Sequence, residues 1–163
     1  MLENSLLETQ IINQNDHLTR EFLLEAKPSV VIDFLIASHW RFRHELIPRI
    51  EQNFMGLIKL QPNKASLPVI FNLFLKFQLA LNIHMDIEEK TVFPDFLQKK
   101  KKRFMDSVSH DNHEPFLSEI IQLLERSDYS VNPFCQLLIQ RLTQFEKELR
   151  EHAWIEEKII HQH

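Results

Sequence analysis

The chain has 163 residues, 44% of them hydrophobic, and a formal net charge of -4 at neutral pH. This size and apolar content predict one compact domain with a buried core, and the acidic balance argues against a general nucleic-acid or membrane binder, because both partners favour a basic excess. The single cysteine, Cys135, excludes an intrachain disulfide and any metal site made of this chain's thiolates alone.

The N-terminal stretch MLENSLLETQ lacks the basic start and apolar centre of a secretion signal. No uninterrupted apolar run approaches the ~20 residues that span a bilayer. We therefore expect a cytoplasmic protein without a membrane segment. Residues 1–27 carry only a weak helical pattern, and we expect them to form an extension of one or two short helices, outside the main domain of residues 28–163.

Apolar residues recur at helical spacing in four longer segments, and the first two form an expected hairpin. The first segment runs from residue 28 to about residue 57, with a kink expected at Pro48. The second begins at Ser66 and is expected to end at the Phe93–Pro94 pair, because proline disfavours a helical residue before it. Two long helices joined by a short connection lie antiparallel.

The remaining two segments form a second expected hairpin. The third runs from near Phe104 to Glu125, although Pro115 removes a backbone hydrogen bond within it. The fourth opens with Asn132 as N-cap, followed by a proline, and continues to Ile159 with apolar steps of four and three. Together the segments predict an all-α, antiparallel up-down-up-down four-helix bundle.

Two of these helices carry the pattern H-x-x-x-E-E on their apolar stripe, once from His84 and once from His152. The spacing of four residues places His84 with Glu88, and His152 with Glu156, on one face about one turn apart. Each pair can therefore reach a single ion. Polar groups on a buried face are costly unless something satisfies them, which favours metal as the partner.

The four helical segments also place one histidine each at the same height. His39 and His84 lie 18 residues from the ends of their helices at the first turn, and His110 and His152 lie 17 and 20 residues from the ends of theirs at the second. At 1.5 Å per residue, the mismatch in the second hairpin is about 4.5 Å, within the error of the helix boundaries. Antiparallel hairpins therefore bring four imidazoles into one layer.

Four imidazoles and the carboxylates of Glu88 and Glu156 suit two metal ions. If both carboxylates bridge the ions and an oxide or hydroxide completes the set, each ion has five ligands and an open sixth position for a small diatomic molecule such as O2 or NO. Imidazole and carboxylate without thiolate are compatible with iron, manganese or zinc, and we favour iron because mixed-ligand dinuclear sites in bundles carry out redox chemistry.

The same residues resemble the motifs of the hemerythrin-like (HHE cation-binding) domain, and most closely the iron-sulfur cluster repair di-iron (RIC) family. SHWRFRHELIP resembles the motif of the first helix, HMDIEEKTVFP that of the second, SHDNHE that of the third and LREHAWIEE that of the fourth. The likeness covers about residues 28 to 160. Residues 1–27 depart from the family, which usually carries a cysteine pair in an N-terminal domain.

This resemblance implies a non-haem di-iron centre with two iron ions per chain, bridged by oxide or hydroxide. The implied ligands are His39, His84, Glu88, His110, His152 and Glu156. It further implies a metal-binding repair protein, rather than a conventional turnover enzyme, that restores iron-sulfur proteins damaged by nitrosative or oxidative stress. A protein that binds or senses O2 or NO is the alternative. The choice between monomer and homodimer stays open, as does a ligand role for His113, for which the family's spacing favours a place outside the ligand set.

Overall fold

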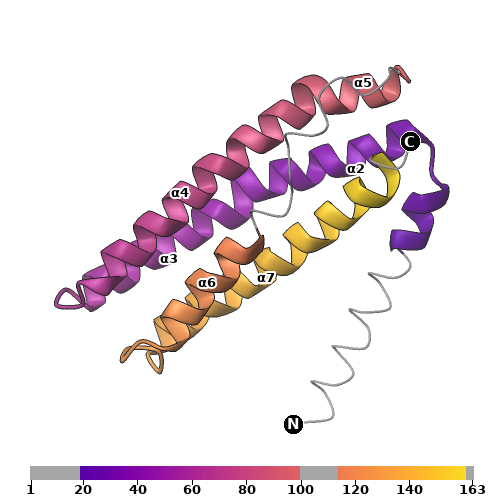
Figure 1. Cartoon of the computed structure of the whole chain (residues 1–163). Helices are drawn as coiled ribbons and strands as arrows, with labels where there is room; N and C mark the ends of the chain where they lie inside the picture. Colours follow the sequence, from indigo (N-terminus) through magenta and orange to yellow (C-terminus); the bar gives the residue numbers. More distant parts are fainter. Residues whose placement is uncertain (1–18, 100–113, 161–163) are drawn as a thin grey trace, which may run out of the picture.

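The computed structural model describes residues 19–99 and 114–160, which form long helical rods packed side by side (Figure 1). The first rod comprises α2 (Pro28–Arg41), the π-helical turn η1 (Phe42–Leu46) and α3 (Ile47–Leu60). The second comprises α4 (Ser66–Ile87), the π-helical turn η2 (Glu88–Val92) and α5 (Phe93–Leu97). The third is α6 (Glu114–Glu125), and the fourth is α7 (Pro133–Ile155) with the π-helical turn η4 (Glu156–Ile160). The predicted all-α bundle is confirmed.

The fourth rod begins as its sequence predicts. Asn132 has an extended backbone, and its side-chain oxygen accepts a hydrogen bond of 2.9 Å from the backbone N–H of Phe134. Pro133 occupies the first helical position, where its missing N–H would have had no partner in any case. The carbonyl of Asn132 accepts from Gln136, which closes the first turn. This cap fixes the register of α7 and hence the height of His152.

The prediction that Phe93–Pro94 ends the second rod is wrong, because the helix continues to Leu97. Pro94 directly follows the π-helical turn η2, just as Pro48 directly follows η1. A proline ring in an ordinary helix collides with the carbonyl four residues earlier. A π-helical turn is wider and shifts that carbonyl, so both prolines are accommodated without a break.

The core forms two clusters of apolar side chains on either side of the three π-helical turns. The larger cluster is rich in aromatic rings, including Phe42, Phe54, Phe74, Phe77 and Phe145. The smaller cluster comprises Leu23, Val31, Ile32, Leu35, Phe93, Ile155, Ile159 and Ile160. The rings of His39 and Phe93 stack at 5.6 Å, and the rings of His152 and Phe42 meet edge to face at 5.6 Å. The polar layer between the clusters is therefore enclosed by apolar groups.

Residues 19–25 form a helical segment that precedes α2 and packs on the fourth rod. Leu23 is buried in the smaller core cluster. Arg20 pairs with Glu151 of α7, and its guanidinium lies 4.7 Å from the centre of the Trp154 ring. These contacts agree with a short helix placed over the bundle, while the rest of the expected extension lies outside the described residues.

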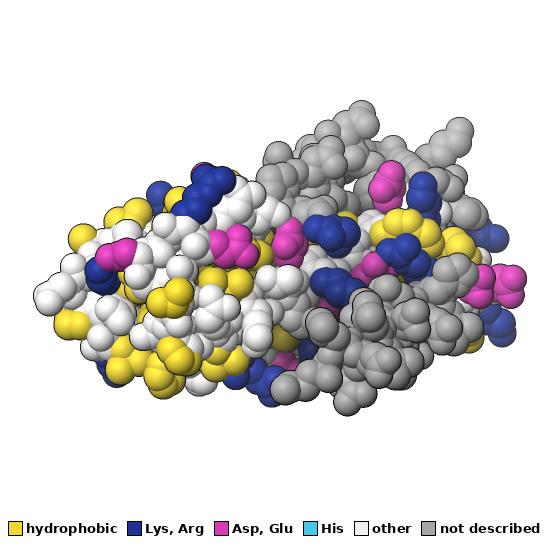
Figure 2. Space-filling model, turned by 90° about the horizontal axis from the view of Figure 1, so that it is seen from below, with side chains coloured by type: hydrophobic (Ala, Val, Ile, Leu, Met, Phe, Trp, Pro, Cys, Tyr) yellow, Lys and Arg dark blue, Asp and Glu magenta, His cyan; other side chains and the backbone are white. Residues whose placement is uncertain are grey.

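The rod from Ser66 to Leu97 is long and apolar enough, by length and composition alone, to cross a membrane. The helices at the core of a bundle meet the same criterion, and this one directs His84 and Glu88 inward. On the molecular face seen in Figure 2, basic and acidic side chains of the described residues are interspersed and form no extended basic patch. That mixture agrees with the acidic net charge.

Candidate metal centre

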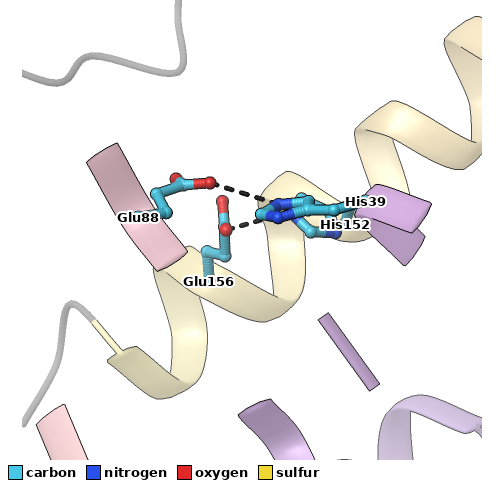
Figure 3. A group of neighbouring side chains, drawn as sticks. All are labelled: His39, Glu88, His152 and Glu156. Carbon is cyan, nitrogen blue, oxygen red and sulfur yellow. Dashed lines mark hydrogen bonds and ion pairs between the residues drawn. The ribbon is translucent and has the colours of Figure 1, made fainter. Parts of the chain in front are cut away.

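Four buried side chains from three helical rods converge between the two core clusters. They are His39 of α2, Glu88 of η2, His152 of α7 and Glu156 of η4, drawn in Figure 3. Each offers one nitrogen or oxygen atom that lies within 4.8 Å of those of the other three. All four residues are at most 5% exposed, so the group is closed to bulk water.

The donor atoms of the two imidazoles point at a common centre. The Nε2 atoms of His39 and His152 lie 3.0 Å apart, and Nε2 of His152 lies 2.9 Å from Oε1 of Glu156. Glu88 adds an oxygen to this centre, since its Oε2 lies 3.3 Å from Nε2 of His39. Two nitrogens and two carboxylates thus surround one point, an arrangement that can hold a metal ion.

Glu88 also connects this centre to a third imidazole. Its second oxygen, Oε1, lies 2.7 Å from Nε2 of His84 on α4. The two oxygens of one buried carboxylate therefore face imidazoles on opposite sides, as a carboxylate that bridges two ions would. The i, i+4 spacing predicted from the sequence places His84 and Glu88 together, and the antiparallel register brings His39 to the same level.

Burial and mutual charge set the protonation states in this group. Burial raises the pKa of Glu156 well above its ordinary value, and the neighbouring carboxylate of Glu88 raises it further. Burial works in the same direction on Glu88, but hydrogen bonds with His39 and His84 outweigh it, and its pKa lies well below the ordinary value. One carboxylate is therefore ionised in preference to the other, because two adjacent buried anions repel each other.

The imidazoles respond to the same surroundings in opposite directions. Burial lowers the pKa of His152 to about 4, so that its ring stays neutral and can donate a lone pair. Burial also disfavours the charged form of His84, but the hydrogen bond and the negative charge of Glu88 outweigh that effect and raise its pKa. A cation placed among these groups would stabilise the ionised form of Glu156 and bind the neutral form of His152.

The chemistry of the donor atoms fits a transition-metal ion. Buried imidazole nitrogens and carboxylate oxygens are ligands that iron, manganese and zinc accept, and the chain's one thiol, Cys135, is buried in the larger core cluster. The Nδ1 atom of His152 is buried and has no hydrogen-bond partner within residues 19–99 and 114–160. This ring therefore depends on Nε2 for its polar contacts in the described structure.

The structure brings together five of the six side chains predicted as ligands: His39, His84, Glu88, His152 and Glu156. The sixth, His110, lies outside the described residues, as does His113. Their roles as ligands stay predictions. His44 is exposed, as its spacing of five residues from His39 predicts, and its ring contacts Trp40 at 5.1 Å.

One contact of this site was not predicted from the sequence. Glu89, the second acid of the first H-x-x-x-E-E pattern, lies 2.7 Å from Nδ1 of His39 on the outer side of the ring. The doubled glutamate was the only signal, and it occurs in both hexads, whereas only the first places its second acid against an imidazole. A linear pattern does not distinguish these two cases.

Comparison with known proteins gives one match. The family model of the hemerythrin HHE cation-binding domain matches residues 30–163, which is most of the chain. Searches of curated proteins and of solved structures gave no significant match.

Proposed function

This chain belongs to the hemerythrin HHE cation-binding domain family, and from that premise we propose that it is a non-haem di-iron protein. The observation that carries the proposal is the buried convergence of His39, Glu88, His152 and Glu156, with His84 attached through Glu88. His110 completes the proposed ligand set. Isolated buried charges are costly, so this group is best explained by a bound cation that its carboxylates neutralise.

When bound, the iron pair would supply one-electron chemistry and a position for a small diatomic ligand. The protein's own residues provide the setting. His39, His84 and His152 direct Nε2 lone pairs inward, and Glu88 faces two of these rings with its two oxygens. Phe42 and Phe93 pack against the histidine rings and exclude water from this layer. A dry, apolar enclosure strengthens the electrostatic attraction between the carboxylates and the metal.

We propose that the physiological role is repair of iron-sulfur clusters damaged by nitrosative or oxidative stress. The proposal is supported by the likeness of the four helix motifs to the repair family and by membership of the wider cation-binding family. The alternative is reversible binding or sensing of O2 or NO, which the apolar enclosure of the site favours.

An assay with a nitric-oxide-damaged [4Fe–4S] dehydratase separates these two roles. If the chain repairs clusters, the iron-loaded protein restores dehydratase activity, and a Glu156→Ala variant does not. If the chain instead binds gas, its visible spectrum changes reversibly with NO or O2 while the dehydratase stays inactive. The second result would overturn the repair role and retain the iron site.

The oxidised, iron-loaded protein is expected to absorb in the near ultraviolet, through charge transfer from a bridging oxide or hydroxide to ferric iron, and NO is expected to alter this band. Absorption spectra recorded before and after addition of NO under anaerobic conditions measure both effects. A colourless protein that nevertheless holds its full complement of iron would contradict an oxygen bridge.

Metal content is also expected to fall as the pH drops below about 6.5, the ordinary imidazole pKa, because protons and metal compete for the same nitrogen lone pairs. The pKa of His152, about 4 without metal, makes this ring the last of the described group to yield its lone pair to a proton. Metal analysis after dialysis over a series of pH values tests this. Full retention in strong acid would show that the imidazoles are not ligands.

A further inference from the structure

Glu89 touches the side of His39 that faces away from the candidate metal centre. Its Oε1 lies 2.7 Å from Nδ1 of His39, whereas Nε2 of the same ring faces His152 and Glu88. The Glu89 side chain is 28% exposed and that of His39 is 1% exposed. The carboxylate therefore reaches from the surface of the bundle to the outer edge of a buried ring.

Arg43 fixes the position and the hydrogen-bonding role of this carboxylate. One of its guanidinium nitrogens donates to the same Oε1 of Glu89 at 2.8 Å, and the other donates to Asp86 at 2.8 Å. The Glu89 carboxylate thus accepts hydrogen bonds from two sides. Because an ionised carboxylate has no proton to donate, a neutral His39 must carry its proton on Nδ1. Its Nε2 lone pair is then free to face the centre.

The second hexad lacks this arrangement. Glu157 occupies the position that matches Glu89, but its side chain is exposed. Within the described part of the chain, Nδ1 of His152 has no hydrogen-bond partner. Two identical H-x-x-x-E-E patterns therefore differ in what their last residue does, and Glu157 provides a control with the same chemistry and sequence setting.

We infer that Glu89 is a positioning residue for His39, and that Arg43 acts through it. The carboxylate holds the imidazole in the Nδ1–H tautomer and keeps Nε2 directed at the metal position. The step from tautomer to metal affinity rests on the function proposed above. A carboxylate that accepts from the outer nitrogen of a ligating imidazole also raises the basicity of the inner one, and losing such a partner typically lowers metal affinity about 10- to 100-fold.

The first part of the test uses metal-free protein, so that it does not depend on the metal assignment. Long-range nitrogen–proton NMR spectra of the histidine rings, recorded at mildly alkaline pH where imidazoles are neutral, report which nitrogen carries the proton. The His39 signals are assigned by their loss in a His39→Ala variant. The wild type and Glu157→Ala are expected to show the Nδ1–H tautomer. Glu89→Ala is expected to shift His39 toward the Nε2–H tautomer, because Glu88 then offers the nearer acceptor.

Glu89→Gln adds a test by rescue, since its amide oxygen can still accept from Nδ1 without carrying a charge. This variant is expected to keep the Nδ1–H tautomer of His39, which separates the hydrogen bond from general effects of mutation on the fold. The inference is overturned if Glu89→Ala retains the wild-type tautomer, or if Glu157→Ala changes it to the same extent.

The second part measures zinc affinity by competition with a chromophoric chelator. Glu89→Ala is expected to weaken binding about 10- to 100-fold and Glu157→Ala to leave it unchanged. Equal losses in the two variants would overturn the link between Glu89 and metal affinity. A wild-type protein that binds neither zinc nor iron would refute the proposed function, while the tautomer measurement would still decide whether Glu89 positions His39.

Discussion

Glu156→Ala is expected to lower the iron bound per chain by at least about tenfold, because even the loss of a residue that only contacts a ligand costs about that much affinity. Glu156 lies within ligand distance of three other donors and is 1% exposed. No solvent molecule in bulk water can readily replace its charge in so dry a site. Iron analysis after reconstitution and desalting measures the effect, and His84→Ala is expected to act in the same direction.

Glu157→Ala is the matched control for this experiment. The residue follows Glu156 in the same π-helical turn but is exposed, so its removal changes the sequence and net charge identically without touching the centre. Its iron content is expected to equal that of the wild type. Unchanged iron in both Glu156→Ala and His84→Ala would refute the assignment of these residues as ligands.

Thermal unfolding of the metal-free proteins distinguishes lost ligation from lost structure. The pKa of Glu156 is raised in the folded state, so the protonated side chain is tolerated at low pH and stability is lost as the pH rises through the folded pKa. Removing this carboxyl is therefore expected to leave the metal-free protein at least as stable as the wild type at neutral pH. A variant that lost both iron and stability without metal would point to misfolding instead.

Much of this site could be predicted from sequence because helical geometry is regular. A spacing of four residues places His84 beside Glu88, and the distances from His39 and His84 to one turn set their common height. The structure confirms that these residues meet. The N-cap at Asn132 likewise identifies the start of α7, since a capping side chain and a following proline form a local signal.

Other features depend on the packed helices and carry no local signal. The three π-helical turns coincide with the polar layer, but proline alone predicts a kink or an end, as the error at Pro94 shows. The contact between Glu89 and His39 joins residues 50 positions apart, and the equivalent Glu157 points elsewhere. Which of two like residues faces a neighbouring helix depends on the rotation of both helices, which the pattern in one of them does not fix.

The fold itself is expected to depend strongly on the aromatic layer beneath the site. Phe145 is fully buried, and its ring centre lies 5.4 Å from that of Phe42 and 5.8 Å from that of Phe77. Phe145→Ala is expected to reduce the free energy of unfolding by about 3–5 kcal/mol, through lost apolar burial and the cavity left in the core. Chemical denaturation of metal-free protein measures this loss.

Phe134→Ala is the control for that variant, because the Phe134 ring, also on α7, is 52% exposed and its removal leaves no buried cavity. The expected change is within about 0.5 kcal/mol, typical of surface positions. A comparable loss in both variants would contradict the idea that burial decides the effect. Phe42 connects this layer to the ring of His152, so Phe145→Ala is also expected to weaken zinc binding in chelator competition, whereas Phe134→Ala leaves it unchanged. Stability and metal affinity would then fall together only where the altered ring supports a ligand.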